Sequence, residues 1–220
     1  MGKLCYNGIT ISPEVRPMFR NLFNPESSLM ITMTWITDCI FLSLFWILGC
    51  FPVVTLGASC AALYDSAYRL WRQGEKHPWQ RFLHVFRTNW KAGILPSLVY
   101  LAAIIAGGKG LIGVWNAAVY GEISWMWFST AALVAVLALG VLSVLFPMLS
   151  RFENSAAGLL KNTVLLALGN VPRTLALGVL NALSGLLTIR FVFPVFFLPA
   201  LTALLSSLLV EPMFKPYLNE

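Results

Sequence analysis

Six mainly apolar stretches alternate with polar segments along the chain. They cover residues 29–50, 52–70, 92–115, 124–148, 174–188 and 194–210. A helix that crosses the roughly 30 Å hydrocarbon core of a bilayer needs about 20 apolar residues, so most of these stretches are candidate membrane spans. The stretch 52–70 is ambiguous because it is less apolar and contains Asp65. It is expected either to cross the membrane or to lie in its interface.

The positions of lysine and arginine decide between these two alternatives. If 52–70 crosses, 13 of the 15 basic residues lie on one side, and only Lys109 and Arg190 lie on the other. Cytoplasmic loops of membrane proteins are enriched in Lys and Arg. We therefore predict an all-α membrane protein with six transmembrane helices in three hairpins and with both termini in the cytoplasm. The predicted organisation is a cytoplasmic N-terminal segment over 1–28, one multi-pass transmembrane domain over 29–211 and a cytoplasmic tail over 212–220.

Composition agrees with a membrane protein. The 220 residues are 58% hydrophobic and 11% charged, and the mean hydropathy is +0.77. Soluble domains carry about 25% charged residues, so the lipid bilayer is the expected surroundings of most of the chain. The net charge of +6 follows from the basic residues of the cytoplasmic side, and no nucleic-acid partner is needed to explain it.

The connection between the second and third stretches contains an amphipathic segment over 78–90. One helical face is apolar, and the opposite face carries Gln80, His84, Arg87 and Lys91. This pattern predicts an amphipathic interfacial helix on the cytoplasmic side. Its apolar face is expected either to pack on the protein and the lipid headgroups or to insert into a groove of a partner. That face consists of Trp79, Phe82, Leu83, Phe86 and Trp90.

Three ionisable residues within apolar stretches are candidates for an intramembrane polar site. Such a group costs about 2.5–3.5 kcal/mol at membrane depth, so it needs a reason to be there. Asp38, near the middle of the first stretch, is expected to face the interior, either as a proton- or cation-linked site or as a structural carboxyl. Asp65 is expected to pair with Arg69 one turn later. Lys109 lies beside a strip of small residues suited to helix packing, Ala102, Ala106 and Gly110, and its long stem can reach the interface.

The sequence contains no recognisable catalytic machinery. The cysteines form no Cys-x-x-Cys pair, and the two histidines are His77 and His84. A zinc site would need closely grouped ligands. No nucleophile elbow or paired catalytic carboxylates are found. We therefore expect no enzyme activity, no catalytic residue, no metal and no cofactor.

Several segments resemble one bacterial family. They are "NPESSLM" at 24–30, "FWILGCFPVVTLGASCAALYDSAYRL" at 45–70, "FLHVFRTNWKAG" at 82–93 and "RFENSAAGLLKNTVLLALGNVPRTL" at 151–175. Together they resemble the YesL-like integral membrane proteins, and the turn with Pro52, Thr55, Gly57 and Ala58 is the most specific part. The resemblance implies a bacterial plasma membrane and an association with carbohydrate uptake and glycan breakdown. It supplies no catalytic residues.

A weaker similarity concerns residues 61–67, "AALYDSA", and the "WQRF" at 79–82. These resemble the cytoplasmic coupling loop of sugar ABC-transporter permeases, which docks on an ATPase. Cys60 and Ser66 depart from the Glu and Gly of that loop, and "WQRF" lies further downstream than the loop requires. The six-span arrangement would also place Ala61 inside the membrane.

Two functions follow as expectations. The first is a non-enzymatic membrane protein that serves as an accessory or partner subunit in carbohydrate uptake, in contact with a transporter subunit or a cytoplasmic ATPase. The second is a small solute transporter or permease that acts by itself, for example as a homo-oligomer. A polar pathway that reaches Asp38 would favour transport. A dry, packed centre with an apolar docking groove would favour the accessory role.

Overall fold

The computed structural model describes residues 28–74, 77–151, 156–191 and 193–214, and all regular elements in these ranges are helices. The chain divides into two compact units, Met1–Asp38 and Cys39–Glu220. The α-helices are α2 (Ser28–Cys50), α3 (Leu56–Gln73), α4 (Pro78–Asn89), α5 (Ile94–Val119), α6 (Trp125–Arg151), α7 (Ala156–Gly169), α8 (Val171–Arg190) and α9 (Leu198–Phe214). Two short 3₁₀ turns, Val53–Thr55 and Phe193–Phe196, precede α3 and α9.

Four of the described helices are long and apolar enough to cross a membrane. They contain the segments Thr32–Cys50, Ile94–Val119, Trp125–Arg151 and Val171–Arg190. These segments correspond to the predicted spans at 29–50, 92–115, 124–148 and 174–188. The helical class is thereby confirmed for the described residues, and four of their helices could span a membrane.

The other two predicted spans fold differently from the expectation. The stretch 52–70 forms α3, which is helical but carries Asp65, Arg69 and Arg72 and is not among the helices apolar enough to span. The stretch 194–210 begins as a 3₁₀ turn, so α9 has only 17 residues. A helix rises 1.5 Å per residue, so α9 is about 25 Å long and falls short of the hydrocarbon thickness. Six crossings are therefore not established.

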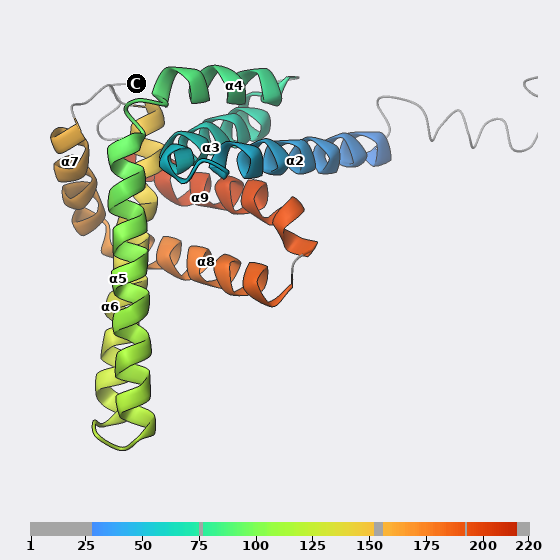
Figure 1. The fold of residues 1–220 in the computed structure, drawn as a ribbon. Helices are drawn as coiled ribbons and strands as arrows, with labels where there is room; N and C mark the ends of the chain where they lie inside the picture. Colours follow the sequence, from blue (N-terminus) through green and yellow to red (C-terminus); the bar gives the residue numbers. More distant parts are fainter. Residues whose placement is uncertain (1–27, 75–76, 152–155, 192, 215–220) are drawn as a thin grey trace, which may run out of the picture. The chain divides into compact units, whose positions relative to one another are not determined.

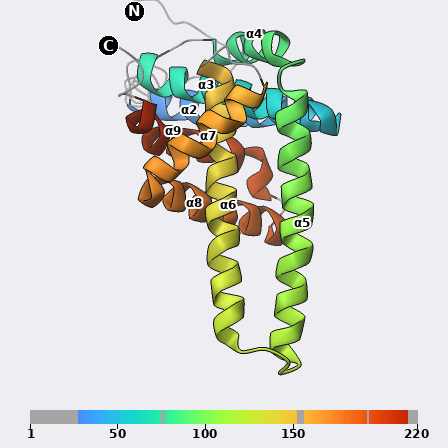
Figure 2. The ribbon, with the colours of Figure 1, turned by 90° about the vertical axis from the view of Figure 1, so that its left-hand side faces the viewer.

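Helices α5 and α6 form a long antiparallel hairpin, which Figures 1 and 2 show in green and yellow. The turn between them passes through Gly121, whose φ is +76°. Near this turn, the rings of Trp115 and Trp125 meet edge to face with centroids 5.6 Å apart. Helix α8 crosses α6 instead of running along it, as both views show. The predicted arrangement of three hairpins is thus not confirmed.

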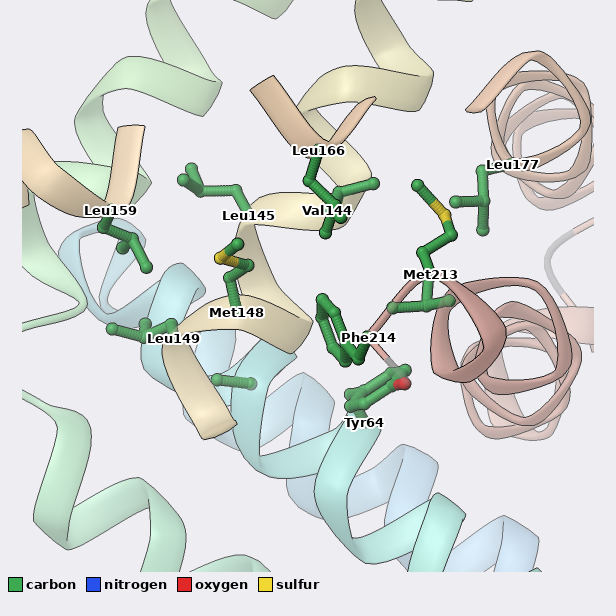
Figure 3. Packing of buried hydrophobic residues seen from close by; sticks show 12 residues of the cluster. Tyr64, Val144, Leu145, Met148, Leu149, Leu159, Leu166, Leu177, Met213 and Phe214 are labelled. Carbon is green, nitrogen blue, oxygen red and sulfur yellow. The ribbon is translucent and has the colours of Figure 1, made fainter. Parts of the chain in front are cut away.

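The most buried helix is α3, which packs against α4, α5, α6 and α9. Every residue from Gly57 to Ala67 is buried except Cys60. One apolar cluster joins α3 to α6, α7, α8 and α9, and Figure 3 shows Tyr64 close to Phe214 in it. A second cluster joins α3 to α2, α4 and α9 around Leu63 and Phe82. Helix α3 ends at Gly74, whose φ of +63° is the left-handed conformation that glycine adopts without strain.

The crossing of α6 and α8 depends on two glycines. A Cβ atom built on Gly140 would clash with the backbone of Thr174, and one built on Gly178 would clash with the backbone oxygen of Val136. Because both obstacles are backbone, they cannot move aside as a flexible side chain could. The absence of side chains at these positions allows the two helices to approach closely, as small residues do in membrane proteins.

The Pro-x-x-Thr-x-Gly-Ala turn has a structural explanation. The hydroxyl of Thr55 lies 2.6 Å from the backbone oxygen of Gly49, so it can donate to the end of α2. Gly57 begins α3 against the start of α5, where a Cβ atom would lie 2.6 Å from the backbone oxygen of Gly93. The backbone N–H of Gly57 donates to the Ser97 hydroxyl at 2.7 Å. The motif therefore fixes how α2, α3 and α5 meet.

Candidate functional site

A cavity of about 380 Å³ lies inside the second unit, among α2, α3, α5, α6, α8 and α9. This volume is within the range of about 300–1,000 Å³ that is usual for small-molecule sites. Among the residues that the structure describes, the lining contains no Asp, Glu, Lys, Arg or His. Its polar members are Cys60, Tyr64, Tyr100, Ser143, Asn181, Ser184, Thr188, Thr202 and Ser206, and the rings of Trp46 and Phe146 complete it.

The polar side chains of this cavity mainly offer hydrogen-bond acceptors. The hydroxyl of Ser143 donates to the backbone oxygen of Leu139 at 2.6 Å, and that of Ser184 donates to Leu180 at 2.8 Å. The Thr202 hydroxyl donates to Pro199 in the same way at 2.9 Å. A hydroxyl that has donated its proton still has oxygen lone pairs. The cavity therefore suits a ligand that brings its own O–H or N–H donors.

The amide of Asn181 also donates within its helix and offers an acceptor to the cavity. Its Nδ2 atom donates to the backbone oxygen of Leu177 at 2.8 Å, so its Oδ1 atom remains an acceptor. Asn181, Ser184 and Thr188 are spaced three and four residues apart and so share one face of α8. Asn181 and Ser184 each donate within the helix and also line the cavity, so this face of α8 is polar inside an otherwise apolar element.

Tyr64 connects the cavity to a charged network. Its hydroxyl donates to Oε1 of Glu211 at 3.2 Å, and the same oxygen accepts a bond from Arg151 at 2.6 Å. The Arg151 guanidinium also lies 4.4 Å from the ring centroid of Tyr68, a cation–π distance. This network links α3, α6 and α9 at the ends of α6 and α9. It holds Tyr64 in position at the cavity wall.

Asp65 is the predicted site residue for which the structure gives most detail. It is 1% exposed and pairs with Nε of Arg69 at 3.2 Å, as the spacing of one turn predicted. It also pairs with Nε of Arg81, from α4, at 2.6 Å. This second partner could not be predicted from spacing, because the two residues lie on different helices. The two arginines compensate the charge of Asp65 in this arrangement.

The remaining candidate ionisable residues lie elsewhere. Asp38 lies in α2, at the end of the unit Met1–Asp38, with a partly buried side chain. Its role as a polar site remains a prediction. Lys109 is exposed on α5. The strip of small residues beside it, Ala102, Ala106 and Gly110, is exposed, and a Cβ atom at Gly110 would meet no atom within 4 Å.

The predicted apolar face of the 78–90 segment is split between the interior and the surface. The segment forms α4, and Phe82 is 2% exposed, stacked on Phe86 with ring centroids 6.2 Å apart. Leu83 and Phe86 are half-buried, whereas Trp79 and Trp90 are exposed. The middle of the face thus packs on the protein itself, while its two tryptophans remain at the surface.

The first of the two segments that resemble a permease coupling loop, residues 61–67, is buried inside the unit, whereas Trp79 and Gln80 of the second are exposed. Ala61 and Ala67 are fully buried in α3. A coupling loop must be accessible to its ATPase, so this stretch is not placed for such docking in the described conformation.

The cavity residues are not among the predicted site residues. The predicted intramembrane site consists of ionisable residues, and the described cavity wall has none. A usable signal was present in the spacing of Asn181, Ser184 and Thr188 and in the pair Thr202 and Ser206. Polar residues that recur on one face of an apolar helix are expected to face the protein interior or a cavity.

Comparison with known proteins gives one family match. Residues 39–107, from the end of α2 through α3 and α4 into α5, match the family described as "Protein of unknown function, DUF624". This match supports the resemblance to an uncharacterised family of membrane proteins over that part of the chain, which includes the turn at Pro52 and the Asp65 cluster. No curated protein and no solved structure matches the chain.

Proposed function

We propose that this chain is a bacterial plasma-membrane protein that binds a small, neutral, hydroxyl-rich solute in the cavity between α3, α6, α8 and α9. The observation that carries the proposal is the cavity wall, which combines acceptor oxygens and aromatic rings with no charged side chain. A charged solute would have to lose its hydration there without a counter-charge, at a large cost. A sugar or polyol brings hydroxyl donors for the oxygens and C–H faces for the rings.

A cavity that takes up its solute from one side of a membrane and releases it on the other transports that solute. The proposal therefore extends to transport by this chain. In the proposed topology both termini and the basic connection that contains α4 are cytoplasmic. Six crossings, with α3 and α9 as the additional ones, remain part of this proposal because of the charge distribution. The carbohydrate association implied by the family resemblance agrees with a sugar as the solute.

The accessory role is a second proposal, and the exposed tryptophans of α4 favour it. Trp79 and Trp90 lie at the surface although both belong to the apolar face of the helix. Large rings are enriched at protein interfaces. In this role the chain would contact a transporter subunit or a cytoplasmic ATPase through α4, without catalysis of its own.

The first proposal can be tested with purified protein in detergent by tryptophan fluorescence, since Trp46 lines the cavity. The probes are glucose, maltose and glycerol, with glucose 6-phosphate and glucuronate as charged counterparts. We expect saturable binding of at least one neutral probe and none of the charged ones. Asn181→Leu and Ser184→Ala should each weaken binding, because each removes an acceptor from the wall.

Ser129→Ala is the matched control for Ser184→Ala. Its hydroxyl donates to the backbone oxygen of Met126 at 2.9 Å, but the residue is exposed on α6 and does not line the cavity. If Ser129→Ala weakens binding as much as Ser184→Ala, or if no neutral probe binds, the cavity is not the solute site. Uptake of the solute into proteoliposomes separates the two functions. Uptake that is lost in Asn181→Leu would indicate a transporter, whereas an accessory protein that only senses the solute would show no uptake.

A further inference from the structure

The ion cluster at the α3–α4 junction has more positive than negative charge. Two guanidinium groups, from Arg69 and Arg81, pair with the single carboxylate of Asp65. Their Nε atoms contact the same oxygen, Oδ2, at 3.2 and 2.6 Å. Counted over the described residues, the cluster therefore carries one more positive than negative charge, and the shared oxygen holds the two guanidinium groups next to each other.

The hydrogen-bond donors of these two arginines are only partly used. Both bond to Asp65 through Nε, which lies along the edge of the guanidinium nearest the side-chain stem. Nη1 of Arg69 also donates to the side-chain oxygen of Gln73, at 3.3 Å. Within the described ranges, the terminal nitrogens of Arg81 have no partner. The two side chains are 31% and 26% exposed, so their free donors reach the surface.

Asp65 thus orients the pair. The carboxylate is itself 1% exposed, so it is unavailable to an outside ligand and serves as a buried anchor. An arginine that is already fixed through Nε loses less conformational entropy when its terminal nitrogens bind a ligand. Two such groups side by side present several N–H donors, and a phosphate has enough oxygen acceptors to accept from both.

We infer that Arg69 and Arg81, anchored by Asp65, form a binding site for a phosphate group at the membrane surface. The phosphate belongs either to a lipid headgroup or to a soluble phosphate or phosphate ester. The exposed rings of Trp71 on α3 and Trp79 on α4 are of the type found at the headgroup level of membranes. This site is separate from the solute cavity, whose lining includes none of the three residues of the cluster.

The test compares two lipids that differ only in the phosphate. Full-length protein in a phosphate-free maltoside detergent is mixed with phosphatidic acid or with diacylglycerol of the same acyl chains, and retention is measured by native mass spectrometry. We expect saturable retention of phosphatidic acid and little of diacylglycerol. Arg81→Lys keeps the charge and can keep the pair with Asp65, but it removes the fork of terminal donors, and should weaken retention at least about tenfold.

Arg87→Lys is the matched control, because Arg87 lies on the same helix with an exposed side chain and no described partner. It should change retention less than about twofold. Equal effects of the two substitutions would mean that only the overall charge of α4 attracts the lipid, and the site would be rejected. Competition by inorganic phosphate separates the two sources of the phosphate group. If inorganic phosphate binds and displaces the lipid, a soluble phosphate can be the ligand. If inorganic phosphate does not reduce lipid retention, the ligand is a lipid headgroup.

A measurement on the unchanged protein covers the case in which Arg81→Lys does not fold. Its melting temperature is compared in inorganic phosphate and in chloride of equal ionic strength, and then with phosphatidic acid against diacylglycerol. A ligand that binds only the folded state raises the melting temperature. We therefore expect a higher melting temperature in phosphate than in chloride, or with phosphatidic acid than with diacylglycerol. No rise with either probe would overturn the inference.

Discussion

The central helix α3 and the outer helix α5 show opposite relations between composition and burial. Helix α3 carries Asp65, Arg69 and Arg72, yet it is buried from Gly57 to Ala67 except at Cys60. Helix α5 is almost wholly apolar, yet of its 26 residues only Pro96, Ser97 and Ala118 are buried. In a protein surrounded by water the apolar helix would be inside and the charged one outside.

The inversion follows from the solvent. In hydrocarbon an apolar side chain loses nothing by exposure, whereas a charged or hydroxyl-bearing side chain without a partner is costly. The polar groups of the protein therefore gather where they can satisfy each other, around α3 and along the wall of the cavity. The comparison implies that substitutions near α3 should have large effects and that equivalent substitutions on the α5–α6 hairpin should have small ones.

The largest difference is expected for the removal of an apolar side chain. Phe82→Ala deletes a ring that is 2% exposed and packed between Phe45 and Phe86. It should lower the free energy of unfolding by about 3 kcal/mol, because a cavity remains. Ile112→Ala, at a position on α5 that is 63% exposed, should cost less than about 1 kcal/mol. Unfolding in detergent with increasing denaturant measures both, and equal losses would contradict the comparison.

A smaller difference is expected for charge. Asp65→Asn keeps the shape of the side chain but removes the anion shared by Arg69 and Arg81. We expect a loss of about 2 kcal/mol, below the 3–5 kcal/mol of fully buried pairs, because both arginines reach solvent. Lys109→Gln removes an exposed charge from α5 and should change stability by less than about 0.5 kcal/mol. If the two variants unfold alike, the Asp65 cluster does not stabilise the α3–α4 junction.

The smallest expected effect differs in sign between the two regions. Gly178→Ala places a methyl group against the backbone oxygen of Val136 and should cost about 1 kcal/mol, because α6 and α8 must separate. Gly113→Ala on α5 meets no atom within 4 Å and should stabilise the helix by up to about 1 kcal/mol. Melting temperatures of the two variants in the same detergent provide the measurement. A rise for Gly178→Ala would show that the α6–α8 crossing does not need the glycine.

Much of the local structure could be predicted from the sequence. The apolar stretches at 29–50, 92–115, 124–148 and 174–188 correspond to four helices that can span a membrane, because helix length against bilayer thickness is a local property. The segment at 78–90 was expected to be an amphipathic helix, and α4 is a helix over Pro78–Asn89. The pair of Asp65 with Arg69 also followed from spacing alone, since both residues lie on one helix, one turn apart.

The functional geometry could not be predicted in this way, because it joins residues that are distant in the chain. Arg81 meets Asp65 only because α4 folds back on α3, and Tyr64 meets Glu211 across 147 residues. The cavity wall draws on six helices, and no single segment reveals it. Composition and period depend on each residue and its near neighbours, so they determine which segments are helices and which can enter lipid. Which polar groups satisfy one another, and where a cavity remains between them, depends on how those helices pack, and only the tertiary structure decided it.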